Sequence, residues 1–137
     1  MPEWIETELK LGLIGEEAWQ LLRARLGPGR VLSQANHFLD RPEGSFRGAR
    51  IGIRLRAENG DRTLTAKGDS APSETVLTRR IELESAIDDT TFDRALREGL
   101  DLVPWIEGWR ESAGAEPEIR DFLDRVEALA AHAPLHC

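Results

Sequence analysis

Charged residues alternate with other types in the segment Glu6-Thr7-Glu8-Leu9-Lys10 near the start of the chain. Because successive side chains of a strand point to opposite faces, a strand here would place Glu6, Glu8 and Lys10 on one side and Leu9 on the other. Same-face residues of a strand lie about 7 Å apart. At that spacing two carboxylates can approach one divalent cation, and a lysine can reach an anion that the cation holds.

The composition predicts one globular domain. The chain has 137 residues, of which 40% are apolar and 31% charged, and no apolar run approaches the length of a membrane span. The N-terminus lacks the basic start and apolar stretch of a signal peptide, and the single cysteine, Cys137, cannot form an internal disulfide. We therefore expect a soluble, cytoplasmic protein.

The charge distribution restricts the partners. A net charge of −7 speaks against broad binding to nucleic acid or to an anionic membrane surface. Arginines and lysines concentrate between Arg41 and Arg80, whereas the last third of the chain is acidic. Any anion site should therefore lie in the first two thirds.

Hydrophobic periodicity predicts an α+β fold with a strand-rich part, 1–87, and a helical part, 88–137. Alternating patterns favour strands at 4–12, 31–39 and 76–85 and a hairpin around Asn59-Gly60, which suits a two-residue type I′ turn. Helical spacing favours helices at 16–26, after a cap at Thr91, around Trp105–Trp109 and from Pro117. Counting back from the hairpin turn predicts the pairs Arg56 with Thr63, Arg54 with Thr65, and Gly52 with Lys67.

The same parity argument collects the charged residues of several strands on one face. A sheet curved with this face inward, and with helices packed outside it, would form a charged cavity that needs a charged ligand, since isolated buried charges are strongly disfavoured. A polyphosphate with Mg²⁺ or Mn²⁺ would satisfy both signs. For any one strand, a solvated sheet face is the alternative. The set comprises the carboxylates Glu6, Glu8, Glu82 and Glu84 and the cations Lys10, Arg54, Arg56, Lys67 and Arg80.

Five segments together resemble the CYTH superfamily, the triphosphate tunnel metalloenzymes, over residues 3–85. The resemblance implies an antiparallel, eight-stranded tunnel and activity on triphosphate compounds, as in thiamine, inorganic and RNA triphosphatases and class IV adenylyl cyclases. The segments are ETELK at 6–10, QANHFLDRP at 34–42, IRLR at 53–56, LTAKG at 64–68 and RRIELE at 79–84.

The resemblance also implies roles for individual residues. Glu6 and Glu8, with Glu82 or Glu84, would hold Mg²⁺ or Mn²⁺. The triphosphate would be bound by cations, with Lys67 near the scissile bond as the catalytic candidate. The implied reaction is metal-assisted attack of water on a terminal phosphorus. The candidate substrate contacts are Lys10, Arg54, Arg56, Lys67 and Arg80.

The sequence departs from the family pattern in two ways. It contains no tyrosine, which excludes the tyrosine–lysine arrangement that some members use. The strands of the family's second half are missing, so we expect one CYTH-like domain over 1–137 that is incomplete at its C-terminus. Its open sheet edge would favour a homodimer. Trp105 and Trp109 match the spacing of a helix core, and an exposed apolar surface that takes part in this dimer is the alternative. A metal-dependent triphosphate hydrolase, a non-catalytic polyphosphate-binding module and, less favoured, a cyclase remain open.

Overall fold

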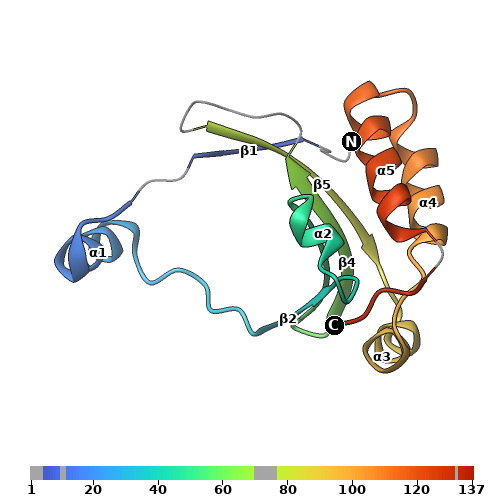
Figure 1. Cartoon of the computed structure of the whole chain (residues 1–137). Helices are drawn as coiled ribbons and strands as arrows, with labels where there is room; N and C mark the ends of the chain where they lie inside the picture. The colour runs from blue at the N-terminus through green and yellow to red at the C-terminus, as the bar shows by residue number, and fades with distance from the viewer. Residues whose placement is uncertain (1–4, 10–11, 70–76, 132) are drawn as a thin grey trace.

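A computed structural model of the chain describes residues 5–9, 12–69, 77–131 and 133–137; for residues 6–9 and 77–79 it describes the backbone alone. These residues form strands and helices in an order that confirms the predicted α+β class (Figure 1). The elements are β1 (Ile5–Leu9), α1 (Gly15–Leu26), β2 (Gln34–Leu39), α2 (Ser45–Gly48), β3 (Ile51–Glu58), β4 (Asp61–Asp69), β5 (Leu77–Ala86), α3 (Asp89–Glu98), α4 (Val103–Ala113) and α5 (Pro117–Ala130).

The five strands form one antiparallel sheet in the order β1-β5-β4-β3-β2. β1 and β2 are the two edge strands and do not pair with each other, so the described strands form an open sheet and not the closed tunnel that the family resemblance implies. Outside the sheet, Asp40 at the end of β2 makes an isolated bridge to His136. The charged residues therefore lie on an open sheet and not inside a tunnel.

The β3–β4 hairpin has the predicted turn and the predicted register. Asn59 and Gly60 have φ angles of 48° and 88°, the positive values that a type I′ turn requires. Arg56 lies opposite Thr63, and Gly52 lies opposite Lys67. The turn thus fixes which side chains of the two strands share a face.

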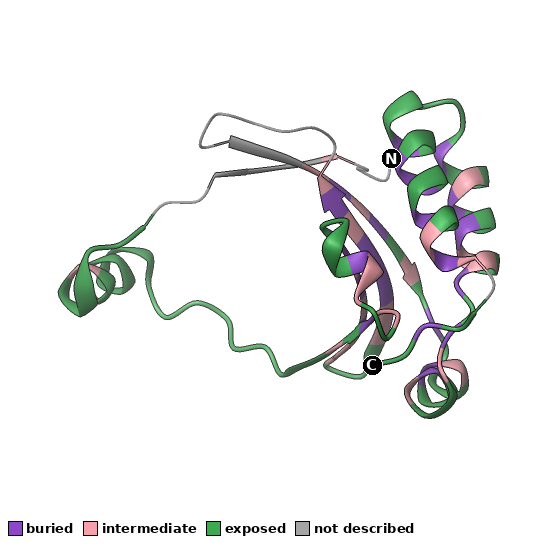
Figure 2. Ribbon diagram, viewed as in Figure 1, coloured by how far each residue is buried: buried purple, intermediate pink, exposed green. Residues whose placement is uncertain are grey.

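One face of the sheet packs against α3, α4 and α5, which lie along the same side of it in Figure 1. Leu55 and Leu64 of the sheet and Phe122 of α5 are completely buried. Burying a side chain of this size contributes roughly 1.5–3 kcal/mol, so this apolar layer stabilises the fold. Figure 2 shows the buried positions concentrated between the sheet and these helices.

Two predictions in the helical part are corrected by the structure. The N-cap of α3 is Asp88, not Thr91: the Asp88 carboxylate accepts hydrogen bonds from the Thr91 amide (2.7 Å) and hydroxyl (2.9 Å). Trp109 is only 4% exposed, and Trp105 packs partly buried against the core. The core role that the spacing of Trp105 and Trp109 predicts is therefore confirmed, and the alternative of a dimer surface in this region is wrong.

The connection after β2 contains a short helix, α2, that the sequence pattern did not predict. The Asp40 carboxylate organises this turn by accepting hydrogen bonds from the backbone amides of Phe46 (2.9 Å) and Arg47 (3.1 Å). The Arg41 side chain donates to the carbonyl oxygens of Leu129 (2.6 Å) and Ala131, at the end of α5. This part of the QANHFLDRP segment therefore connects the sheet to the last helix. β2 itself begins at Gln34, three residues later than expected.

α1 differs from the other long helices because it has no buried residue. It stands apart from the sheet in Figure 1, on the segment that joins the edge strands β1 and β2. Gly27 ends the helix with a φ of 85°, a backbone conformation that favours glycine. None of the helices in the described ranges is long and apolar enough to cross a bilayer.

Candidate anion and metal site on the open sheet

The face of the sheet opposite the helices carries the charged residues that parity predicts. In β5, Glu82 lies between Ile81 and Leu83, which are both completely buried, so its side chain points away from the core. The same alternation applies to β3 and β4. We refer to the residues on this side as the charged face: Arg54, Arg56, Lys67, Arg80, Glu82 and Glu84.

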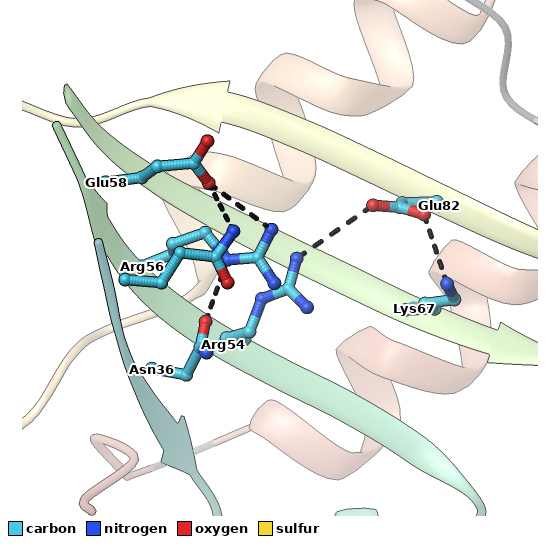
Figure 3. Close-up of polar contacts among 7 residues, drawn as sticks. Asn36, Arg54, Arg56, Glu58, Lys67 and Glu82 are labelled. Atoms are coloured by element: carbon cyan, nitrogen blue, oxygen red, sulfur yellow. Dashed lines mark hydrogen bonds and ion pairs between the residues drawn. The ribbon is translucent and has the colours of Figure 1, made fainter. Parts of the chain in front are cut away.

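The Glu82 carboxylate lies between two cations of neighbouring strands. Lys67 is directly opposite Glu82 in the register, and its Nζ is 3.3 Å from Glu82 Oε2. Arg54 reaches the same carboxylate from β3, with Nη2 4.0 Å from Oε1 (Figure 3). The three side chains are 17–24% exposed, so water screens these ion pairs only in part.

Arg56 is held by polar side chains of β2 and of its own strand, β3. Its Nε donates a hydrogen bond to Asn36 Oδ1 at 2.8 Å, and its Nη1 lies 3.9 Å from Glu58 Oε2 (Figure 3). Gln34 of β2 donates to the same Glu58 oxygen at 2.6 Å. These contacts restrict the guanidinium to one orientation on the charged face.

Arg54 is the most buried cation of the charged face: 17% of its side chain is exposed. Burial lowers the pKa of its guanidinium, the nearby charge of Arg56 lowers the pKa further, and Glu82, Glu84 and Glu58 act in the opposite direction. Its Nε is buried and has no hydrogen-bond partner among the described residues. An additional anion at this position would stabilise the charged form.

The other end of the charged face carries Arg80, whose Nε lies 3.3 Å from Asp69 Oδ1. Across the β1–β5 pair, Glu6 lies opposite Arg80 and Glu8 lies opposite Thr78. The register therefore brings the backbone of residues 6–9 beside β5, with Glu6 next to Arg80. The side chains of Glu6 and Glu8 lie outside the description, and so does Lys10 as a whole.

The available donors suit a hard cation. Glu82 and Glu84 provide carboxylate oxygens, which Mg²⁺ and Mn²⁺ prefer, and Mg²⁺ is commonly held by one or two carboxylates together with substrate phosphates. Within the described ranges, no three histidine, cysteine or acidic side chains gather closely enough to hold a metal ion by themselves. The described donor set thus fits a cation that is shared with a phosphate ligand.

Several residues of this surface were missed by the sequence-based site. Asn36 and Glu58 contact Arg56, and Asp69 contacts Arg80. Thr65, opposite Arg54 in the register, is 1% exposed, and its hydroxyl has no hydrogen-bond partner among the described residues. Each of the four either lies an even number of residues from a predicted site residue of its own strand or pairs with one on the neighbouring strand, so it shares the face of that residue. The alternation of side chains along the strands could therefore have found all four.

Comparisons with known proteins show the family and the fold of the chain. The CYTH domain model matches residues 4–132, whereas no curated protein matches the sequence. A candidate adenylate cyclase from Bacillus halodurans has a similar structure, with a TM-score of 0.52 and 17% identity over 77% of this chain and 55% of that one. A candidate adenylyl cyclase from Hippeastrum, described as having a dominant triphosphatase activity, gives a TM-score of 0.57 and 20% identity over 90% of this chain and 57% of that one. The chain thus spans little more than half the length of these two proteins, and it belongs to the CYTH domain family.

Proposed function

We propose that this chain binds a triphosphate compound together with Mg²⁺ or Mn²⁺ and hydrolyses it. The observation that carries the proposal is the group of partly buried cations, Arg54, Arg56 and Lys67, on one face of a CYTH-type sheet. Arginine binds phosphate oxygens through two parallel hydrogen bonds, and lysine acts as a compact positive charge. The triphosphatase activity described for the Hippeastrum protein supports the same reaction class.

The side chains divide the work by position. Arg56, fixed by Asn36 and Glu58, would hold one phosphate in a set orientation. Arg54 and Lys67, both beside Glu82, would neutralise charge on the transferred phosphate and on the leaving oxygens. In this proposal Lys10 and Arg80 extend the phosphate contacts.

The carboxylates of the charged face complete the proposed site. Glu82 and Glu84, with Glu6 and Glu8 of β1, would hold the divalent cation. When bound, such a cation supplies charge neutralisation and lowers the pKa of bound water. The acidic side chains keep it at the phosphate-binding side of the sheet.

A non-catalytic polyphosphate-binding module is the second candidate. The open sheet favours it, because phosphoryl transfer depends on positioning and on charge stabilisation around the phosphate, whereas the described strands form one wall. An open face also leaves water in contact with the ion pairs, which weakens each of them.

The experiment measures binding and turnover on the same samples. Tripolyphosphate with Mg²⁺ should raise the melting temperature, because a ligand that binds only the folded state stabilises it. Arg54→Ala combined with Arg56→Ala should abolish the shift. The matched control is Arg94→Ala with Arg97→Ala, which removes the same charge from exposed positions of α3. Phosphate release is then measured with tripolyphosphate, thiamine triphosphate and ATP.

The outcomes separate the candidates. A thermal shift with phosphate release that both disappear in the Arg54/Arg56 variant supports the hydrolase. A thermal shift without phosphate release supports the binding module. If the wild type shows no shift, or if the Arg54/Arg56 variant keeps it, the charged face is not the phosphate site.

A further inference from the structure

One large aromatic side chain is exposed on the charged face of the sheet. Nine large apolar side chains of the described residues are exposed; eight lie within 13–32, and the ninth is Phe38 of β2, which is 62% exposed. Its neighbours in β2 point to the helix side: His37 meets the ring of Phe92 edge-on, with centroids 6.1 Å apart, and Leu39 is 2% exposed. Alternation along the strand therefore places the Phe38 ring on the charged face.

The register puts this ring beside the proposed phosphate site. Phe38 lies directly opposite Arg54, and Arg56 is its diagonal neighbour on β3. The Cβ atoms of opposite residues are about 5 Å apart and those of diagonal neighbours about 7 Å apart. Gly52 adds no side chain between the ring and β4: a Cβ there would lie 3.9 Å from Cε1 of Phe38 and 4.0 Å from the carbonyl oxygen of Lys67. An exposed aromatic ring thus adjoins the cations.

The surroundings of the ring indicate what kind of molecule covers it. An apolar protein segment packed on Phe38 would also remove water from Arg54 and Arg56, and it would offer no charge in return. A molecule that joins an aromatic ring to several phosphates meets both requirements, because its ring stacks on Phe38 and its phosphates contact the guanidinium groups. Arg54 also retains a hydrogen-bond donor, its buried Nε, that no described residue satisfies.

We propose that Phe38 determines specificity by stacking on the base of a nucleoside triphosphate whose phosphates bind to the cations of the charged face. This inference rests on the proposed function, since it uses the same phosphate site, and it adds the organic group that the site accepts. A neutral base is favoured over the cationic thiazolium ring of thiamine triphosphate, because Arg54 and Arg56 repel a positive ring. Stacking on an aromatic side chain tolerates any base, so both purine and pyrimidine nucleotides should bind.

Isothermal titration calorimetry with ATP and with tripolyphosphate tests the stacking. A metal-chelating buffer prevents the metal-dependent hydrolysis proposed above, so both ligands stay intact during the titration. Loss of one base–aromatic stack lowers affinity by roughly 5- to 150-fold. Phe38→Ala should therefore raise the Kd of ATP at least about fivefold more than it raises the Kd of tripolyphosphate, which has no base.

Two further variants separate stacking from apolar contact and from folding. Phe38→Leu keeps an apolar side chain without an aromatic face and should lose affinity for ATP, whereas Phe38→Trp should keep it. The matched control is Trp19→Ala, which removes a 46% exposed aromatic side chain from α1, the helix that stands apart from the sheet in Figure 1. It should change neither Kd. Melting temperatures identify any variant that fails to fold, and the comparison of Phe38→Leu with Phe38→Trp then decides.

The outcomes distinguish this inference from the proposed function. Selective loss of ATP affinity in Phe38→Ala and Phe38→Leu, with Phe38→Trp like the wild type, supports the stacking. Equal changes in the Kd of ATP and of tripolyphosphate, or an ATP affinity that Phe38→Leu leaves intact, would overturn the stacking and leave the phosphate site standing. Tighter binding of thiamine triphosphate than of ATP would overturn the choice of a nucleotide. A wild type that binds neither ATP nor tripolyphosphate would overturn the proposed function as well.

Discussion

Glu82→Gln should tighten the binding of tripolyphosphate in the absence of divalent metal. In the structure the Glu82 carboxylate lies 3.3 Å from Lys67 and 4.0 Å from Arg54. It therefore competes with a phosphate for both cations and repels the phosphate directly. Glutamine keeps the size of the side chain and removes the charge, so the competition should weaken.

The geometry sets the size of the effect. A phosphate oxygen bound on the far side of Lys67, at about 2.8 Å from Nζ, would lie about 6 Å from Glu82, given the 3.3 Å ion pair. Two unit charges 6 Å apart repel by about 0.7 kcal/mol in water and about 3 kcal/mol at an effective dielectric constant of 20. Glu82 is 22% exposed, so we expect about 1.5 kcal/mol, roughly a tenfold lower Kd.

Isothermal titration calorimetry in a metal-chelating buffer measures this Kd. The control is Glu84→Gln, which removes the same charge from the same strand but lies opposite Thr65 and not opposite Lys67. It should change the metal-free Kd less than Glu82→Gln does. With Mg²⁺ present, both substitutions should weaken the binding of tripolyphosphate, because Glu82 and Glu84 both belong to the proposed carboxylate set. Weaker or unchanged metal-free binding in Glu82→Gln would refute the competition at this carboxylate.

Two further predictions concern stability. Gly68→Ala should lower the free energy of unfolding by about 1–3 kcal/mol in denaturant titrations, because its Cβ would lie 2.5 Å from Cε2 of Phe122. The control Gly52→Ala, whose Cβ would have no atom nearer than 3.9 Å, should lower this free energy less. Equal losses in the two variants would contradict the prediction. Hydrogen bonds from the backbone and then the hydroxyl of Thr91 lower the pKa of Asp88, so Asp88→Ala should lower the melting temperature at pH 7. This difference should shrink as pH falls below the ordinary aspartate pKa of about 3.9 and through the lower folded-state pKa; a difference that persists to pH 2 would point to a cause other than the carboxylate.

Local rules were sufficient for the charged face of the sheet. The Asn59-Gly60 turn has one favoured geometry, and once it is placed, the period of two determines the partner and the face of each residue in β3 and β4. The predicted opposition of Arg54 and Thr65 was confirmed for this reason. The same rule places Asn36, a neutral polar residue, and Glu58, the carboxylate beside the turn, on the face that carries Arg56. Both could therefore have been predicted as supports for Arg56.

Other features depend on contacts that no local pattern contains. The apolar stripe of α1 resembles that of α5, but α5 packs on the sheet and α1 does not. Periodicity describes a face and not its partner. Similarly, Trp109 could have lain in a core or in an interface. Its burial and its 3.4 Å hydrogen bond to the Glu84 carbonyl depend on where α4 crosses β5.

The balance of charges favours a ligand that carries both signs. Each of the four cations of the charged face forms an ion pair with Glu58, Asp69 or Glu82, and all of these side chains are only partly exposed. A bare polyanion would gain contact with the cations but would also meet the carboxylates between them, Glu82 first. A divalent cation bound with the polyphosphate would neutralise those carboxylates, and the arginines and Lys67 would contact phosphate oxygens. Binding of metal and of polyphosphate to this face should therefore be mutually reinforcing, with Glu82 as the residue through which each favours the other.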